Sequence, residues 1–188
     1  VMFTPETITK IDPKHTFNTI ELGANFQHNE SVFSEAKILF KRFSDNLNSG
    51  ENRAILKPSF QFAIMEQPVT ASLILDYVSG TFEKEYYAFF EKKYTNGFAG
   101  ISAGIPYDKN GISFHLGATI LYSSTDLTLD ATKTEQKNNV HIYPNIQASY
   151  RLNGDKLIAY AAAEGDLLQN SYEGFTTENP FVSPTLDV

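Results

Sequence analysis

The most constraining feature of this sequence is a pair of alternating runs within residues 138–168, which meet at Asn153-Gly154. Asn-Gly is a strong hairpin signal, because both central residues of a type I′ turn need φ > 0. A turn at this point pairs two apolar sets, Tyr150, Ala148 and Ile146 with Leu157, Ala159 and Ala161. The opposite face of the hairpin is largely polar. In a soluble protein the apolar face would pack into a core, whereas in a membrane barrel it would contact lipid and the polar face would line a lumen.

Three more hairpins repeat this alternation and bring the predicted strands to eight. Their strands are expected at 16–28 and 31–43, at 53–65 and 68–78, and at 96–107 and 111–124. The first hairpin is predicted to place Leu22 opposite Ala36 and Glu21 opposite Lys37. The second turns at Glu66-Gln67, with Ile64 opposite Val69, and the third matches Ala99–Ile105 with Ile112–Ile120. Glycines 97, 100, 104 and 117 fall mostly on the polar face and indicate bends or crowding there.

The connections between these strands alternate in length. Short turns are expected at 28–30, 66–67, 108–111 and 153–155, and long connections at 44–52, about 79–96, 124–139 and 165–188. Short turns at one end and long loops at the other are typical of outer-membrane barrels. We therefore predict an all-β, antiparallel up-and-down meander that forms a transmembrane β-barrel or part of a larger one. Pro58 and Pro144 oppose a regular barrel, because proline removes a donor from the ladder.

The domain organisation follows from the same pattern. Residues 1–15 are interpreted as a loop or connection, 16–168 as the barrel strands, and 169–188 as an extracellular loop or the start of a further strand. No intact signal peptide is visible, and no apolar run is long enough for a transmembrane helix. The net charge of −7 argues against a nucleic-acid partner. The absence of cysteine excludes disulfides, thiol catalysis and thiolate metal sites.

The C-terminal part adds short motifs, which are Tyr143-Pro144-Asn145, Asn170-Ser171-Tyr172, Asn179-Pro180-Phe181 and Ser183-Pro184. With these motifs, residues 140–184 resemble outer-membrane β-barrel proteins of flavobacterium-like bacteria, relatives of the TonB-dependent receptor barrels. The resemblance implies location in the bacterial outer membrane and further strands after residue 188. Neither a plug domain nor a TonB-contact segment is visible, so energised transport is not carried over to this chain.

The polar faces supply the candidate site residues, which in a barrel would share a lumen. They are Glu21, Glu35, Lys37, Lys41, Arg53, Lys57, Gln61, Asp76, His115, His141 and Arg151. In a narrow barrel such residues satisfy one another, and in a wider one they line a passage. His115 and His141 lie on neighbouring strands without a carboxylate at helpful spacing, so hydrogen-bonded histidines are favoured over a metal site.

No pattern indicates catalysis. The sequence has no Gly-x-Ser-x-Gly elbow and no glycine-rich phosphate loop before a helix, and we expect no cofactor. The predicted function is a porin-like or receptor-like outer-membrane barrel for transport, permeation or surface binding. Its expected partners are membrane lipid and further barrel segments or partner chains. The alternative is a soluble all-β binding module that encloses an apolar ligand or core.

Overall fold

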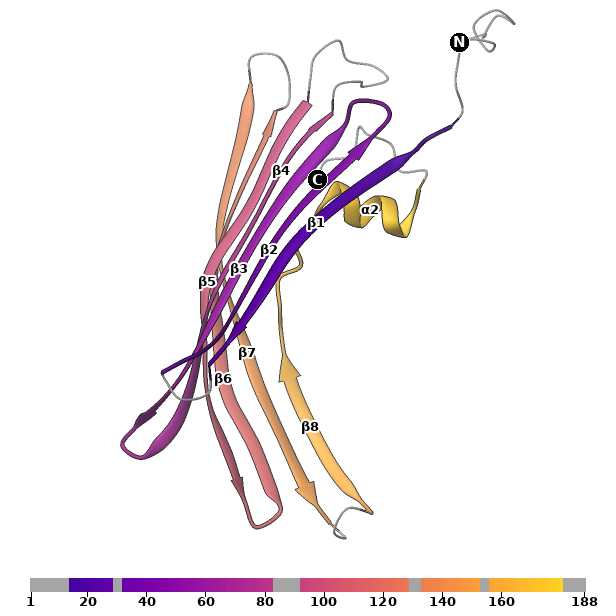
Figure 1. Cartoon of the computed structure of the whole chain (residues 1–188). Helices are drawn as coiled ribbons and strands as arrows, with labels where there is room; N and C mark the ends of the chain where they lie inside the picture. Colours follow the sequence, from indigo (N-terminus) through magenta and orange to yellow (C-terminus); the bar gives the residue numbers. More distant parts are fainter. Residues whose placement is uncertain (1–13, 29–31, 83–91, 129–132, 153–155, 181–188) are drawn as a thin grey trace, which may run out of the picture.

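The computed structural model describes residues 14–28, 32–82, 92–128, 133–152 and 156–180. They form one antiparallel sheet of eight strands and a short helix (Figure 1). The elements are β1 Phe17–Gln27, β2 Phe33–Asp45, β3 Gly50–Ile64, β4 Gln67–Phe82, β5 Lys92–Lys109, β6 Ile112–Thr128, β7 Thr134–Arg151, β8 Ile158–Glu164 and α2 Tyr172–Glu178. We call the end where β1 is followed by β2, and β3 by β4, the turn end. The opposite end, which carries α2, is the helix end.

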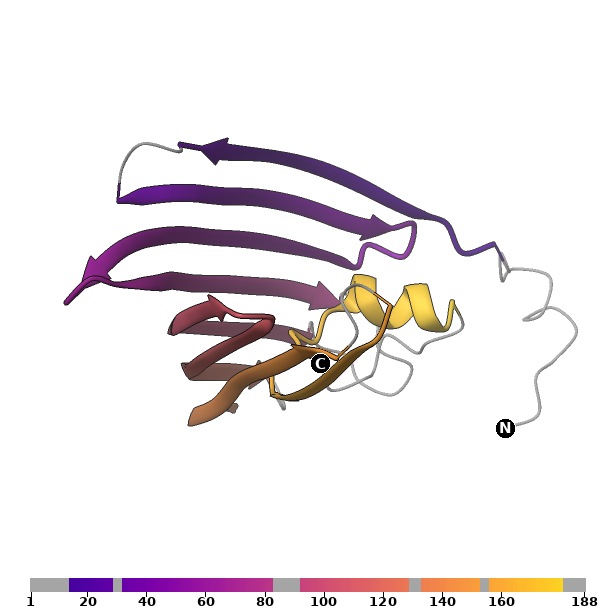
Figure 2. The same ribbon diagram turned by 90° about the horizontal axis from the view of Figure 1, so that it is seen from below.

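The strands are neighbours in chain order, from β1 to β8. This confirms the predicted all-β, antiparallel up-and-down meander. Over the described residues the sheet is not closed into a barrel, because β1 and β8 form its two edges. Figure 2 shows the sheet curling around α2, which lies on the concave side.

Glycines facing the concave side permit this curvature. Gly104 of β5 lies directly opposite Gly117 of β6, and Gly100 lies four residues before Gly104 on the same face of β5. A Cβ at Gly100 would lie 2.2 Å from the carbonyl oxygen of Ile120 and 2.5 Å from a methyl carbon of Leu121. The missing side chains let the two backbones approach on the inside of the bend.

Replacing Gly100 with alanine should therefore destabilise the sheet. The added methyl group meets backbone, which cannot move aside as a side chain can, and overpacking of this kind costs about 1–3 kcal/mol. The free energy of unfolding in urea measures the effect. Gly97→Ala is the matched control, since a Cβ there would lie 3.3 Å from a ring carbon of Tyr77 and is expected to change stability by less than about 0.5 kcal/mol. Equal stability of Gly100→Ala and the wild type would contradict this explanation of the bend.

The predicted strand faces are correct, but the registers predicted for the first, second and fourth hairpins are wrong. Leu22 pairs with Phe40 instead of Ala36, and Glu21 with Lys41 instead of Lys37. In the second hairpin the turn is Met65-Glu66, both with positive φ, so that Val69 pairs with Phe62 instead of Ile64. Each shift is an even number of residues, which preserves the face of every side chain. In the third hairpin Ala103 pairs with Ala118, and the turn is Asn110-Gly111.

The hairpin of β7 and β8 is shifted by two residues as well. Tyr150 pairs with Ala159 and Ala148 with Ala161, and the amide of Leu152 donates to the carbonyl oxygen of Leu157 at 2.9 Å. The predicted turn at Asn153-Gly154 lies outside the described residues. β8 ends at Glu164, and within the tail expected to be a loop or the start of a strand the residues Tyr172–Glu178 form α2. Residues 181–188 of this tail lie outside the described residues.

Two of the expected long connections are short. β2 continues to Asp45 and β3 starts at Gly50, so the predicted loop 44–52 is a tight turn. β6 reaches Thr128 and β7 begins at Thr134, which shortens the loop expected at 124–139. The middle of the connection between β4 and β5 lies outside the described residues. The predicted rhythm of short and long connections is therefore weaker than the sequence indicated.

Both prolines lie where the ladder is interrupted. The pairing of β3 with β4 skips Lys57 and Pro58 and resumes at Ser59. The pairing of β7 with β8 ends at Asn145, next to Pro144, and from there to Thr134 the one described strand that pairs with β7 is β6. This matches the confinement of proline to edges and irregular positions.

The convex face of the sheet carries a continuous band of apolar side chains. One row crosses seven strands through Ala24, Ile38, Leu56, Leu75, Ala99, Tyr122 and Val140. The band, as we use the term, consists of the convex-face residues Leu22–Phe26, Ala36–Phe40, Ala54–Ile64, Val69–Tyr77, Ala99–Tyr107, Ile112–Tyr122, Val140–Tyr150 and Ala159–Ala163, every second residue in each range. Most of its large side chains are exposed.

Between the band and the helix end the polarity of the two faces is inverted, so that the convex face is polar and the concave face is apolar. There the convex face carries polar residues such as Asn52, Ser79, Thr95 and Asp126. The concave face carries Phe43, Val78, Phe82 and Tyr94, which are buried together with Tyr172 of α2. This aromatic core explains why the strands extend beyond the predicted boundaries, although the apolar-outward alternation ends.

Candidate functional site

The candidate site is the concave face together with α2. Strand alternation and the observed registers place all eleven predicted lumen residues on this face. Four of them are brought together at the helix end, and the others are distributed toward the turn end.

The four converging residues form two ion pairs. The Lys41 ammonium lies 3.2 Å from Glu21 on the neighbouring strand and 3.1 Å from Glu173 of α2. The Arg53 guanidinium donates two hydrogen bonds to Asp76, at 3.0 and 2.7 Å, in the bidentate arrangement that suits both groups. The Asp76 side chain is almost completely buried, so that without Arg53 its carboxylate would have no counter-charge in this pair.

Glu35 and Gln61 line a polar recess at the turn end. This recess has a volume of about 670 Å³, and its wall includes the hydroxyl groups of Ser59, Thr70 and Ser72. The Ser59 and Ser72 hydroxyls lie 3.0 Å apart, and the Thr70 hydroxyl donates to the carbonyl oxygen of Gly104. Their polar groups therefore bond to one another and to the backbone.

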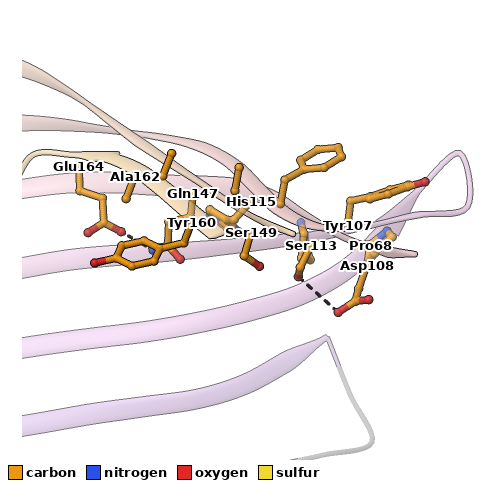
Figure 3. A pocket seen from close by; sticks show the side chains of 14 residues that line it. Pro68, Tyr107, Asp108, Ser113, His115, Gln147, Ser149, Tyr160, Ala162 and Glu164 are labelled. Atoms are coloured by element: carbon orange, nitrogen blue, oxygen red, sulfur yellow. Dashed lines mark hydrogen bonds between the residues drawn. The ribbon is translucent and has the colours of Figure 1, made fainter. Parts of the chain in front are cut away.

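His115 lines a second recess of about 690 Å³ at the turn end (Figure 3). Gln147 and Glu164 are hydrogen-bonded there, and the Ser113 hydroxyl donates to Asp108 at 3.3 Å. His141 lies elsewhere, with its Nε2 3.1 Å from the hydroxyl of Ser123. Across the part of the chain that the structure describes, no three histidine, aspartate or glutamate side chains gather as a metal site would require.

The remaining predicted residues do not converge on one point. Lys37 lies directly opposite Lys57 on the concave face. Arg151 pairs with Ile158 at the turn end. The structure thus separates the predicted lumen residues into an ion-paired group near α2 and a dispersed polar lining.

The docking of α2 involves residues that the sequence analysis did not select as candidate site residues. Ser171 caps the helix by accepting a hydrogen bond from the amide of Gly174 at 3.0 Å. The Tyr172 ring packs edge-on against Phe43 and Phe82, with centroids 5.3 and 4.9 Å apart. Its hydroxyl donates to Asp45 at 2.9 Å. The only signals for this helix were Ser171 and the acidic Glu173 in its first turn, since Gly174 and the two threonines have low helix propensity.

Glu51 connects α2 to the sheet. Its buried carboxylate accepts hydrogen bonds from the Tyr94 hydroxyl and from the backbone amide of Tyr172, the latter at 2.5 Å. Glu51 lies beyond the band, and its burial raises the pKa of the carboxyl group. Burial and the hydrogen bond to Asp45 also raise the pKa of the Tyr172 phenol. A carboxylate at the first turn of a helix is favourably placed for the partial positive charge of its amides.

Comparison with known proteins gives no relative from which a role could be transferred. No protein-family model matches this chain, and neither the curated proteins nor the solved structures give a match. Among the described residues no helix is long and apolar enough to cross a membrane.

Proposed function

We propose that this chain is a bacterial outer-membrane β-barrel, or part of a larger one, that serves transport, permeation or surface binding and not catalysis. The observation that carries this proposal is the exposed apolar band on the convex face, opposite a polar concave face. Membrane barrels require this arrangement, because lipid surrounds the outside and water or polar groups fill the inside.

On the central strands, β3 to β7, the height of the band fits a bilayer. On β3 the band runs from Ala54 to Ile64, and on β4 from Val69 to Tyr77. Tilted membrane strands need about 9–11 residues. The band tyrosines lie at its margins, with Tyr77 and Tyr122 toward the helix end and Tyr107 and Tyr150 toward the turn end. Tyrosine is enriched at both membrane interfaces.

The direction of curvature argues against the soluble alternative. A module that enclosed an apolar ligand or core would need its apolar residues on the inside of the curve. Here the band lies on the outside, and the inside carries the ion pairs and α2. A soluble protein would have to cover the band with another layer.

The two edges of the sheet are suited to pairing with further strands of the barrel or with partner chains. The most exposed band residues lie there, with Leu22 of β1 74% and Ile142 of β7 70% exposed, against 41% for Leu73 in the middle. β1 contains one charged residue and no proline or lysine, so it lacks the usual protection of an edge strand. Pairing both edges would satisfy the backbone, as a membrane requires.

Spin labels on adjacent residues of β3 test the proposal. The chain has no cysteine, so Phe62→Cys and Gln61→Cys each provide one labelling site. In liposomes the label at position 62 should collide often with oxygen and rarely with an aqueous nickel reagent, because it faces lipid. The label at position 61, on the concave face, should show lower oxygen accessibility.

A protected label at position 62, with few collisions with either reagent, would contradict the membrane proposal. It would favour a soluble assembly in which the band is covered by protein. A chain that is monodisperse in water without detergent would also contradict the membrane proposal.

A further inference from the structure

After β8 the chain leaves the sheet and turns across its concave face. The amide of Gly165 donates to the carbonyl oxygen of Pro144 at 3.2 Å. A Cβ at Gly165 would lie 2.6 Å from a ring carbon of Tyr143, so glycine permits the close approach. We call residues Gly165–Glu178, which include α2, the strap.

The middle of the strap lies over β5 and β6. Leu167–Asn170 line a hollow of about 160 Å³ together with Asn96, Phe98, Ser123 and Thr125. From there the strap reaches β3, where Tyr172 is docked. It thus passes over the concave face from the edge at β8 to β3 and β2, and Figure 2 shows α2 on that face.

The strap is anchored chiefly at one place. Its buried residues are Ser171, Tyr172 and Thr176, which all belong to α2 or its cap, while the rest of the strap is partly or fully exposed. The anchor consists of the Tyr172 ring, the hydrogen bond from its hydroxyl to Asp45, the hydrogen bond from its backbone amide to Glu51, and the ion pair between Glu173 and Lys41. Segments with few buried contacts open at lower free energy than the surrounding sheet.

We propose that the strap is a gate across the interior of the barrel, closed when Tyr172 is docked and open when α2 is released. This inference rests on the proposed barrel. The docked and released states differ in one cooperative set of contacts, which gives the two discrete arrangements that a gate needs. The band does not take part, so the strap can move without disturbing the contact with lipid.

Thiol labelling measures docking. Thr176→Cys introduces a thiol at a buried position of α2, and a water-soluble maleimide should label it slowly in the otherwise unchanged protein. Adding Tyr172→Ala removes the buried ring and should raise the labelling rate roughly tenfold or more. Adding Thr177→Ala, at an exposed position of the same helix, should leave the rate unchanged.

Conductance measures gating. The intact protein inserted into a planar bilayer should conduct at least about twofold better with Tyr172→Ala than with Thr177→Ala or without a substitution, because the strap no longer crosses the pore. Tyr172→Phe keeps the ring and removes the bond to Asp45, so it should give an intermediate value. This milder variant keeps the test decisive if Tyr172→Ala does not assemble.

Two negative results have different meanings. If the wild type inserts and conductance stays the same while labelling rises, the strap is released without opening a pore, and the gate is wrong. If the wild type does not insert, the barrel proposal itself is contradicted, and the gate with it.

Discussion

Arginine in place of Leu73 should prevent assembly of the protein into membranes. Leu73 lies at the middle of the band and pairs with Ile101, on a row that continues through Ile120 and Ile142. An arginine facing lipid near the midplane of the bilayer costs about 2–4 kcal/mol in a membrane barrel. The measurement is the folded fraction in liposomes, read as the species whose gel mobility changes on heating.

Gln61→Arg is the control for this substitution, since it places the same side chain on the exposed concave face. It should assemble as the wild type does. If the sheet stood in water with its convex face free, Leu73→Arg would change stability by less than about 0.5 kcal/mol. Equal assembly of the two variants would therefore contradict contact between the band and lipid.

Removing the guanidinium of Arg53 should produce the second large effect. Asp76 is buried, and Arg53 supplies both of its bidentate hydrogen bonds. Arg53→Ala leaves that carboxylate without its counter-charge, and breaking a buried pair in this way costs about 3–5 kcal/mol. The free energy of unfolding in urea, with the protein in detergent, measures the loss.

The double variant Arg53→Met/Asp76→Leu separates the charge from the packing. It removes both ions, and it should recover most of the stability, because no buried charge remains. Lys137→Ala provides a second control, since Lys137 and Glu135 form an exposed pair worth less than about 1 kcal/mol. If Arg53→Ala and Lys137→Ala lowered the free energy of unfolding equally, the ion pair between Arg53 and Asp76 would contribute no more than an exposed pair, and this explanation would be wrong.

The alternation of side chains predicted the strands and their faces, but not their registers. Period-two patterns fix which residues point outward, and an even shift leaves that pattern unchanged. The β1–β2 pairing shows this, since Glu21 meets Lys41 and not Lys37, yet both lysines face the concave side. Two of the turns lie within two residues of their predicted positions, Asn110-Gly111 inside 108–111 and Met65-Glu66 one residue before 66–67. Asn-Gly is a standard hairpin signal, whereas Met-Glu is not, although both of its residues are left-handed here.

The helix end was predicted least well, and the inversion of polarity explains why. Phe82 and Tyr94 face inward there, so the apolar-outward alternation stops although the strands continue. The sequence therefore indicated loops where β2, β6 and β7 extend. The group around Glu51 was missed for a related reason: Tyr172 reaches it from far along the chain, and no local spacing reveals such a contact.

Because the polarity of the faces inverts at the helix end, the two ends of the sheet should contribute differently to the heat-capacity change of unfolding. Unfolding the core of Phe43, Val78, Phe82, Tyr94 and Tyr172 exposes aromatic surface to water, which raises the heat capacity as in any water-soluble domain. If the band lies in lipid, its side chains leave one apolar environment for another, and it contributes little to that change. Cooling would then weaken the hydrophobic packing of α2 against the sheet, while the contact between the band and lipid would change little. Temperature would therefore act on the two ends of the same strands in different ways.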